Sequence, residues 1–263
     1  MHPIAFHLGD LAVHWYGIFM ATGLLVGLWT ANRRALRENV SPELVTDAGM
    51  WIMAGAVIGA RLFFIVTHWE QEFAGQPLSK MIFIRAGFVF YGGLIGASLA
   101  FILFTRKKKV SLWKFADIMA PSVPLGHAFG RIGCVMTGCC HGKACELPWA
   151  ITYPDGHSTH PHAVHPTQIY EAILLVGLYF FLIWLWKRKK FDGHVFSIYL
   201  LIYACLRAFV ELFRGDYPKE NMIGLLTPGQ VTGMVIFVTG LILFFKLPRK
   251  LEKIPSEAKP NSP

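Results

Sequence analysis

The sequence has little charge. Only 16% of its 263 residues are Asp, Glu, Lys or Arg, and 54% are hydrophobic, whereas soluble globular proteins have about a quarter of charged residues. This shortage excludes an ordinary soluble domain and indicates an integral membrane protein. The first apolar run also lacks a basic segment in front of it, so we expect no cleaved signal peptide.

Acidic residues are scarcer than basic ones, which gives a formal net charge of +9. A surplus of this sign can indicate nucleic-acid binding. Here, however, the basic residues occur in short clusters between apolar runs, which is typical of the positive-inside topology of membrane proteins. We therefore expect the lipid bilayer as the surroundings and no nucleic acid as a partner.

Seven apolar runs are each close to the roughly 20 residues that cross a bilayer as a helix. They cover residues 13–30, 47–67, 88–104, 113–133, 167–186, 195–213 and 227–245. Basic clusters follow the first, third, fifth and seventh run, and with seven spans all four clusters face one side of the membrane. This pattern predicts an outside N-terminus and a cytoplasmic C-terminus.

The predicted fold is therefore an all-α integral membrane protein. A domain of seven transmembrane helices covers residues 1–250, and residues 134–166 form a small outer cap. The polar residues 251–263 contain prolines and are expected to be a disordered cytoplasmic tail.

Glycines four residues apart recur within the apolar runs. This spacing lets helices pack closely in a membrane, so we interpret the pairs as structural. Five of them are Gly23/Gly27, Gly55/Gly59, Gly92/Gly96, Gly126/Gly130 and Gly229/Gly233.

Arg131 stands at the outer end of the fourth run, between Gly130 and Gly133. A guanidinium keeps its proton, and at membrane depth it is costly unless it meets an anion or a water-filled cavity. The flanking glycines let a ligand approach closely. Arg131 is thus a candidate phosphate receptor. The alternative is an arginine whose head group simply extends to the membrane surface.

The sixth run has Tyr203, Arg207, Glu211 and Arg214 at spacings of four, four and three. Residues at these intervals share one face of a helix. Arg207 lies inside the run and should face the protein interior or a polar cavity, and Glu211 can pair with either arginine. One interpretation is a structural ladder of ion pairs. The other is an outward-facing site for an anionic lipid headgroup.

Arg61, near the outer end of the second run, would bring a third arginine to the same depth, which favours the headgroup site. At that level Tyr91 stands beside Gly92 and Gly93 at the start of the third run. Glu171 lies in the first turns of the fifth run, where the helix dipole favours an acidic residue, and a good helix start explains it without any function.

Five segments carry a family resemblance. They are Val13-His-Trp-Tyr-Gly17, Tyr91-Gly-Gly-Leu94, Gly130-Arg-Ile-Gly133, His165-Pro-Thr-Gln-Ile-Tyr-Glu171, and Arg207 with Glu211 and Arg214. In this order and combination, they resemble the bacterial prolipoprotein diacylglyceryl transferases.

The resemblance implies a seven-span enzyme of the bacterial inner membrane, with its active site facing the outer leaflet. Such an enzyme moves the diacylglyceryl group of phosphatidylglycerol to the lipobox cysteine of a prolipoprotein signal peptide. The product is a thioether, glycerol 1-phosphate leaves, and no metal or other cofactor is required.

The resemblance and the residue pattern together define a candidate site. Its expected catalytic residues are Arg131, Arg207, Glu211 and Tyr91. Its expected substrate-binding residues are the same two arginines with Arg214, Tyr16, Arg61, Tyr203, Gly92 and Gly93.

The chain departs from its apparent family directly after Arg131. The family usually continues with Asn-Phe-x-Asn-Gly-Glu, whereas this chain has Cys134-Val-Met-Thr-Gly-Cys139 followed by Cys140. A thiol-redox protein or a metal site is one alternative function. The spacing of these cysteines and Cys145 contains no C-x-x-C pair and disfavours it. A non-enzymatic lipid or anion carrier is the other alternative.

The outer side of the membrane is oxidising, so we expect disulfides among these four cysteines. We expect neither Cys134 nor Cys139 to act as the nucleophile, because the reaction already uses the thiol of the incoming lipoprotein. The proton of that thiol would pass to Glu211, Tyr91 or His141.

Overall fold

The computed structural model describes residues 3–9, 11–75, 87–216 and 226–252. The described chain is mostly helical, and four of its described helices are long and apolar enough to cross a membrane: Pro42–Thr67, Thr167–Trp186, His194–Glu211 and Pro228–Leu247. In chain order the elements are β1 (Ile4–Leu8), β2 (Leu11–His14), α1 (Trp15–Arg37), α2 (Pro42–Thr67), the short π-helix η1 (Trp69–Phe73), α4 (Phe90–Lys107), α5 (Leu112–Met119), α6 (Ser122–Thr137), α7 (Thr167–Trp186), α8 (His194–Glu211) and α9 (Pro228–Glu252).

The chain divides into two compact units, residues 32–115 and residues 1–31 with 116–263. In the first unit, α2 packs along α4. A Cβ added to Gly55 would lie 2.6 Å from the carbonyl oxygen of Gly96, so the two helices pack backbone to backbone at these glycines. The predicted packing role of this spacing is confirmed here.

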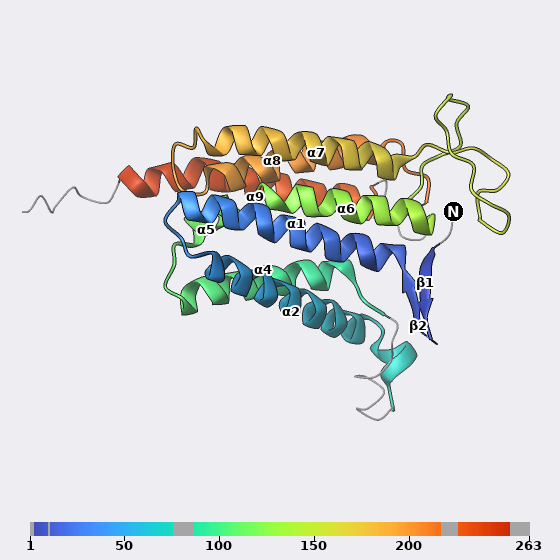
Figure 1. Ribbon diagram of the computed structural model, residues 1–263, viewed down its shortest axis with the longest axis horizontal. Helices are drawn as coiled ribbons and strands as arrows, with labels where there is room; N and C mark the ends of the chain where they lie inside the picture. Colours follow the sequence, from blue (N-terminus) through green and yellow to red (C-terminus); the bar gives the residue numbers. More distant parts are fainter. Residues whose placement is uncertain (1–2, 10, 76–86, 217–225, 253–263) are drawn as a thin grey trace, which may run out of the picture. The chain divides into compact units, whose positions relative to one another are not determined.

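In the second unit, α6, α7, α8 and α9 pack successively against one another (Figure 1). The first part of α1 lies against α6, where a Cβ on Gly23 would come within 2.8 Å of the Gly126 carbonyl oxygen. The hydroxyl groups of Thr30 and Ser122 are 2.8 Å apart at the other end of this contact. Close packing of α6 on its neighbours fixes the position of Arg131.

The all-α prediction is wrong at the N-terminus, where β1 and β2 form an antiparallel hairpin. The physical signal was present in the sequence. Isoleucine, phenylalanine and leucine alternate with other residues over 4–8, and Gly9-Asp10 follows as a turn dipeptide.

The predicted fourth span is two helices in the structure, α5 and α6, which separate between Met119 and Ser122. Pro121 lies at this break, and a proline inside a helix removes a hydrogen-bond donor and clashes with the preceding turn. Arg131 therefore belongs to a helix of 16 residues instead of one long span.

Residues 138–166, within the predicted cap, form a loop region pinned by short bridges such as Ala144 to Val164. The side chain of Tyr153 in this region is only 1% exposed. Of the predicted disordered tail, residues 251–252 are the last residues of α9, and residues 253–263 lie outside the described residues.

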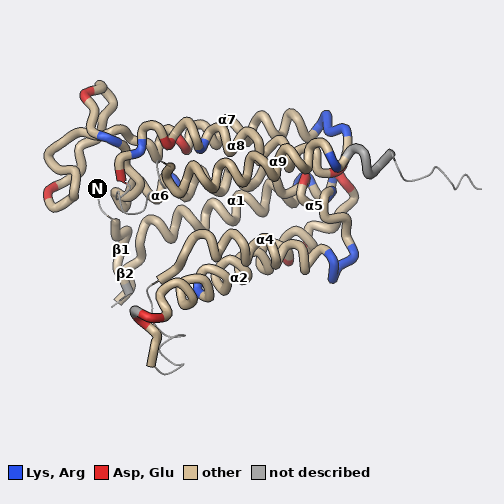
Figure 2. The backbone as a smooth tube through the Cα atoms, turned by 180° about the vertical axis from the view of Figure 1, so that it is seen from behind, with Lys and Arg blue, Asp and Glu red and all other residues tan. Residues whose placement is uncertain are grey.

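The basic clusters lie at helix ends (Figure 2). In the second unit, the cluster 187–190 follows α7 at the end opposite the loop 138–166. In the first unit, the cluster 106–109 covers the C-terminal end of α4 and lies at the same end of the helix pair as the start of α2. The common side of all four clusters, and with it the membrane orientation, stays a prediction.

Candidate active site around Glu171

Glu171, one turn into α7, joins the two arginines that the sequence singled out. Its Oε1 lies 3.0 Å from Nη2 of Arg131 on α6. Its Oε2 lies 3.6 Å from Nη1 of Arg207 on α8. The carboxylate is only 5% exposed, so one buried acid bridges two arginines from the helices on either side of α7.

A second acid completes the group. Glu211 follows Arg207 by one helical turn, and its Oε2 forms an ion pair with Nη2 of that arginine at 2.7 Å. Its Oε1 accepts a hydrogen bond of 2.5 Å from the Thr227 hydroxyl, just before α9. A Cβ on Gly229 would lie 2.7 Å from this oxygen and 2.8 Å from the arginine Nη2. The start of α9 therefore closes directly over the ion pair.

The group has two positive and two negative charges, and its side chains are between 0% and 13% exposed. Charges buried to this extent persist only when they are paired and hydrogen-bonded. The hydrogen bonding is incomplete among the residues that the structure describes: Oε1 of Glu171 and Oε2 of Glu211 have no hydrogen-bond donor, and the buried Nε of Arg131 has no acceptor. A buried guanidinium donor without an acceptor is typical of a site that takes an anionic or polar ligand.

His127 belongs to the same group, although the sequence analysis missed it. It lies one turn before Arg131 on α6, and its Nε2 is 3.7 Å from Oε1 of Glu171. Its ring centroid is 5.9 Å from that of Tyr203, which places this predicted site residue beside the group. The spacing of four residues between His127 and Arg131 was the available signal, because such residues share a helix face.

Two other predicted residues lie in this unit. The ring of Tyr16, at the start of α1, packs on α6, with Cδ2 3.1 Å from where a Cβ of Gly133 would be. The prediction that Arg214 continues the helical face of Arg207 is wrong, because α8 ends at Glu211. Arg214 instead makes a bidentate pair with Asp216, at 2.9 Å and 2.7 Å.

The remaining predicted residues belong to the first unit. Nη1 of Arg61 donates a hydrogen bond of 3.1 Å to the Gly87 carbonyl oxygen. Tyr91 lies in the first turn of α4, next to Gly92 and Gly93. These two glycines face α2, and a Cβ on Gly93 would lie 3.4 Å from the Ala56 carbonyl oxygen. Packing explains both glycines, and the substrate roles of all four residues stay predictions.

The five cysteines are all described, and all are free thiols, so the expected disulfides are absent. The Sγ atoms of Cys134, Cys139 and Cys140 lie near one another, within 4.8 Å, which is well beyond a disulfide bond length of about 2 Å. The pKa of the Cys140 thiol is lowered, first by hydrogen bonds from the two other thiols and then by the positive charges of Arg214 and Arg131.

Comparison with known proteins identifies the family of the chain. The family model described as prolipoprotein diacylglyceryl transferase matches residues 3–246. Three similar proteins carry the name phosphatidylglycerol–prolipoprotein diacylglyceryl transferase. The protein from Agrobacterium fabrum is 35% identical over 91% of this chain and 89% of its own length. The one from Finegoldia magna is 33% identical over 96% and 98%, and the one from Campylobacter lari is 34% identical over 95% and 94%.

The match covers all the helices that hold the two arginines and the two acids, and the relatives are aligned over nearly their whole length. The chain therefore belongs to the prolipoprotein diacylglyceryl transferase family.

Proposed function

We propose that this membrane protein transfers the diacylglyceryl group of phosphatidylglycerol to a cysteine thiol of prolipoproteins. The observation that carries the proposal is the buried bridge from Arg131 through Glu171 to Arg207, with the unpartnered Nε–H of Arg131 beside it. The names of the relatives supply the two substrates.

The arginines suit the phosphate of the lipid. A planar guanidinium binds two phosphate oxygens at once, and Arg131 and Arg207 are held by Glu171 as a pair. In the reaction the sulfur of the lipobox cysteine bonds to the glycerol carbon while the bond from that carbon to the phosphate oxygen breaks. Glycerol 1-phosphate leaves with its negative charge, which fixed cations stabilise strongly in a site of low dielectric.

The proton of the attacking thiol needs an acceptor, for which Glu211, Tyr91 and His141 are the candidates. Both oxygens of Glu211 are already engaged, Oε2 in an ion pair with Arg207 at 2.7 Å and Oε1 in a hydrogen bond from Thr227. This engagement favours a role in holding Arg207 over a role as base. His141 lies in the loop 138–166 with its Nδ1 3.1 Å from the Gly142 carbonyl oxygen. The tautomer that donates from Nδ1 to this carbonyl leaves Nε2 as the proton acceptor.

The membrane arrangement that we propose has seven spans, with α5 and α6 together forming the fourth. The N-terminus lies outside, the C-terminus lies in the cytoplasm, and the active site faces the outer leaflet of the bacterial inner membrane. Single cysteines at Ser111 and Ser158, in a chain whose native cysteines are serines, test this with an impermeant thiol reagent. Only Ser158→Cys should be labelled in intact cells; labelling of Ser111→Cys would contradict the span count.

The function is tested with purified protein in detergent, phosphatidylglycerol and a synthetic lipobox peptide, followed by mass spectrometry of the peptide. The expected result is a diacylglyceryl adduct on the peptide cysteine, and no adduct with Arg131→Ala. Phosphatidylglycerol binding by a folded protein that leaves the peptide unchanged would refute the transferase and indicate a lipid carrier.

A further inference from the structure

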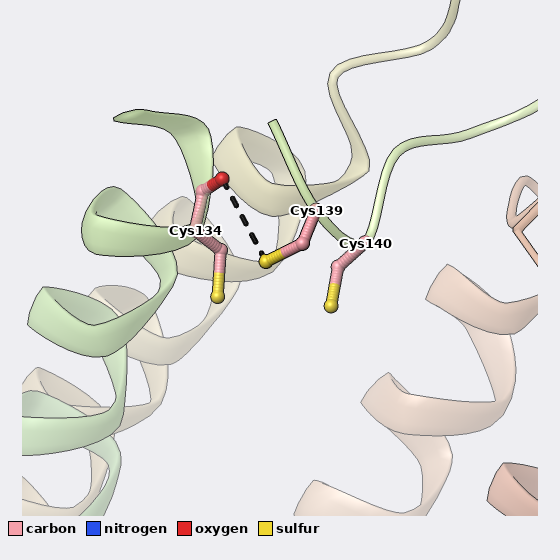
Figure 3. Close-up of side chains that lie close together, drawn as sticks. All are labelled: Cys134, Cys139 and Cys140. Carbon is pink, nitrogen blue, oxygen red and sulfur yellow. Dashed lines mark hydrogen bonds between the residues drawn. The ribbon is translucent and has the colours of Figure 1, made fainter. Parts of the chain in front are cut away.

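Three thiols converge where α6 ends. Cys134 lies in the last turn of α6 and is buried, whereas Cys139 and Cys140 follow the turn at Gly138. Figure 3 shows the three side chains turned toward one region, and their Sγ atoms all lie within 4.8 Å of one another. Among the described residues, no further cysteine and no histidine, aspartate or glutamate adds a ligand atom to this group.

The backbone is shaped to make the thiols converge. Gly138 ends α6 in the left-handed conformation with φ 79°, and Cys140 has φ 65°, which is unusual for a residue with a side chain. These two positions turn the chain back, so that Cys139 and Cys140 return to the helix end. The reversal explains how a spacing without a C-x-x-C pair still brings three sulfurs together.

The turn is held by the start of α7. The Thr167 hydroxyl donates to the Cys140 carbonyl oxygen at 2.7 Å. The Gln168 amide donates to the Cys139 carbonyl oxygen at 2.6 Å. Both of these α7 side chains are only 1% exposed. The thiols thus lie on a rigid frame, while the exposed side chain of Cys139 leaves the group accessible to a small ion.

We propose that Cys134, Cys139 and Cys140 bind one copper(I) ion through their three sulfur atoms. Soft thiolate ligands select copper(I) and zinc among the common metals. Zinc in structural sites takes four ligands, and the described residues offer three. Three metal–sulfur bonds of about 2.3 Å in a trigonal plane place the sulfur atoms about 4 Å from one another. The Sγ atoms lie within 4.8 Å of one another, so each pair has to approach by less than about 1 Å when the ion binds.

Two positive charges lie near the cluster. Arg131 and Arg214 both act electrostatically on Cys140, and although each is paired with a carboxylate, Glu171 and Asp216 respectively, they favour the thiolate form that a metal needs. The site would fasten the end of α6 to the loop that follows it, three residues beyond Arg131. It is independent of the proposed transfer reaction, which needs no metal.

The test is a titration of the reduced, metal-free, full-length protein in detergent with copper(I), in competition with a chromophoric copper(I) chelator. We expect one equivalent to bind, and X-ray absorption to show sulfur neighbours only, at about 2.3 Å. Cys134→Ser, Cys139→Ser and Cys140→Ser should each abolish this stoichiometric binding. Cys145→Ser and Cys205→Ser are the matched controls and should retain it.

A second measurement needs no variant. Bound copper(I) should protect three of the five thiols of the unaltered protein from alkylation, and peptide mapping should identify them as the three cluster cysteines. Copper binding that survives the cluster substitutions would overturn the proposal, as would binding of zinc(II) without copper(I). A disulfide between two cluster cysteines, in protein whose thiols were trapped in the membrane, would also overturn it.

Discussion

The bridge at Glu171 makes a sharp prediction for Glu171→Gln. The amide keeps the size of the side chain and one acceptor oxygen, but it removes the negative charge that Arg131 and Arg207 share. Arg207 keeps Glu211 at 2.7 Å as its counter-charge. Arg131 loses its partner at 3.0 Å, so most of the effect should fall on that residue.

The magnitude follows from burial. Removing one partner of a buried ion pair costs about 3–5 kcal/mol when nothing replaces it. The retained amide oxygen still accepts a hydrogen bond, so we expect the lower end, about 3 kcal/mol, in the free energy of unfolding. If the loss of this ion pair also raises the free energy of the transition state by about 3 kcal/mol, transfer slows by about 10²-fold, since each 1.4 kcal/mol is tenfold in rate.

The assay measures both quantities on one preparation, unfolding in detergent and the rate of adduct formation on the lipobox peptide. Glu146→Gln is the matched control, because it makes the same chemical change at an exposed position of the loop and should alter neither quantity. Wild-type stability and rate for Glu171→Gln would refute the reasoning, because the carboxylate could then not be the charge that holds the two arginines.

Three further predictions use the same assays. Arg131→Lys and Arg207→Lys should each lower transfer by about 10²-fold or more while the protein still inserts, because lysine keeps the charge but not the planar fork; near-normal transfer would reduce the arginine to a general positive charge. Gly229→Ala should destabilise the protein by about 1–3 kcal/mol, because its Cβ would lie 2.7 Å from a Glu211 oxygen, whereas Gly233→Ala, with its nearest neighbour at 3.8 Å, should be tolerated. Cys139→Ser should keep measurable transfer, and a complete loss in a folded protein, or a lipid adduct on this cysteine in the unaltered protein, would show that the thiol takes part in the chemistry.

The sequence predicted most of the helices well, because long apolar runs bounded by basic clusters leave few alternatives. The run 167–186 coincides with α7, and the run 195–213 begins one residue after the first residue of α8. The predictions were wrong where a local rule competed with hydropathy. Pro121 divides an apparently continuous apolar run, and the alternating residues before Trp15 form a hairpin where hydropathy alone predicts no strand.

The site was only partly predictable. The contact between Arg207 and Glu211 follows from their spacing on one helix. The bridge from Arg131 to Arg207 does not, because it depends on how α6 and α8 pack on either side of α7. A good helix start was enough to explain Glu171 from the sequence alone. The convergence of the cysteines was equally hidden, since it depends on two left-handed residues and on side chains 27 and 29 residues away in the chain.

The first two turns of α7 position both the loop after α6 and the two arginines of the site. Thr167 and Gln168 hold the loop, and Glu171, one turn later, holds the arginines. A helix turns about 100° per residue, so inserting or deleting a single residue between Gln168 and Glu171 would swing one set of contacts away from the other. Changes in chain length are therefore excluded from this short stretch, and variation in length has to occur elsewhere, for example in the exposed turn around Gly156.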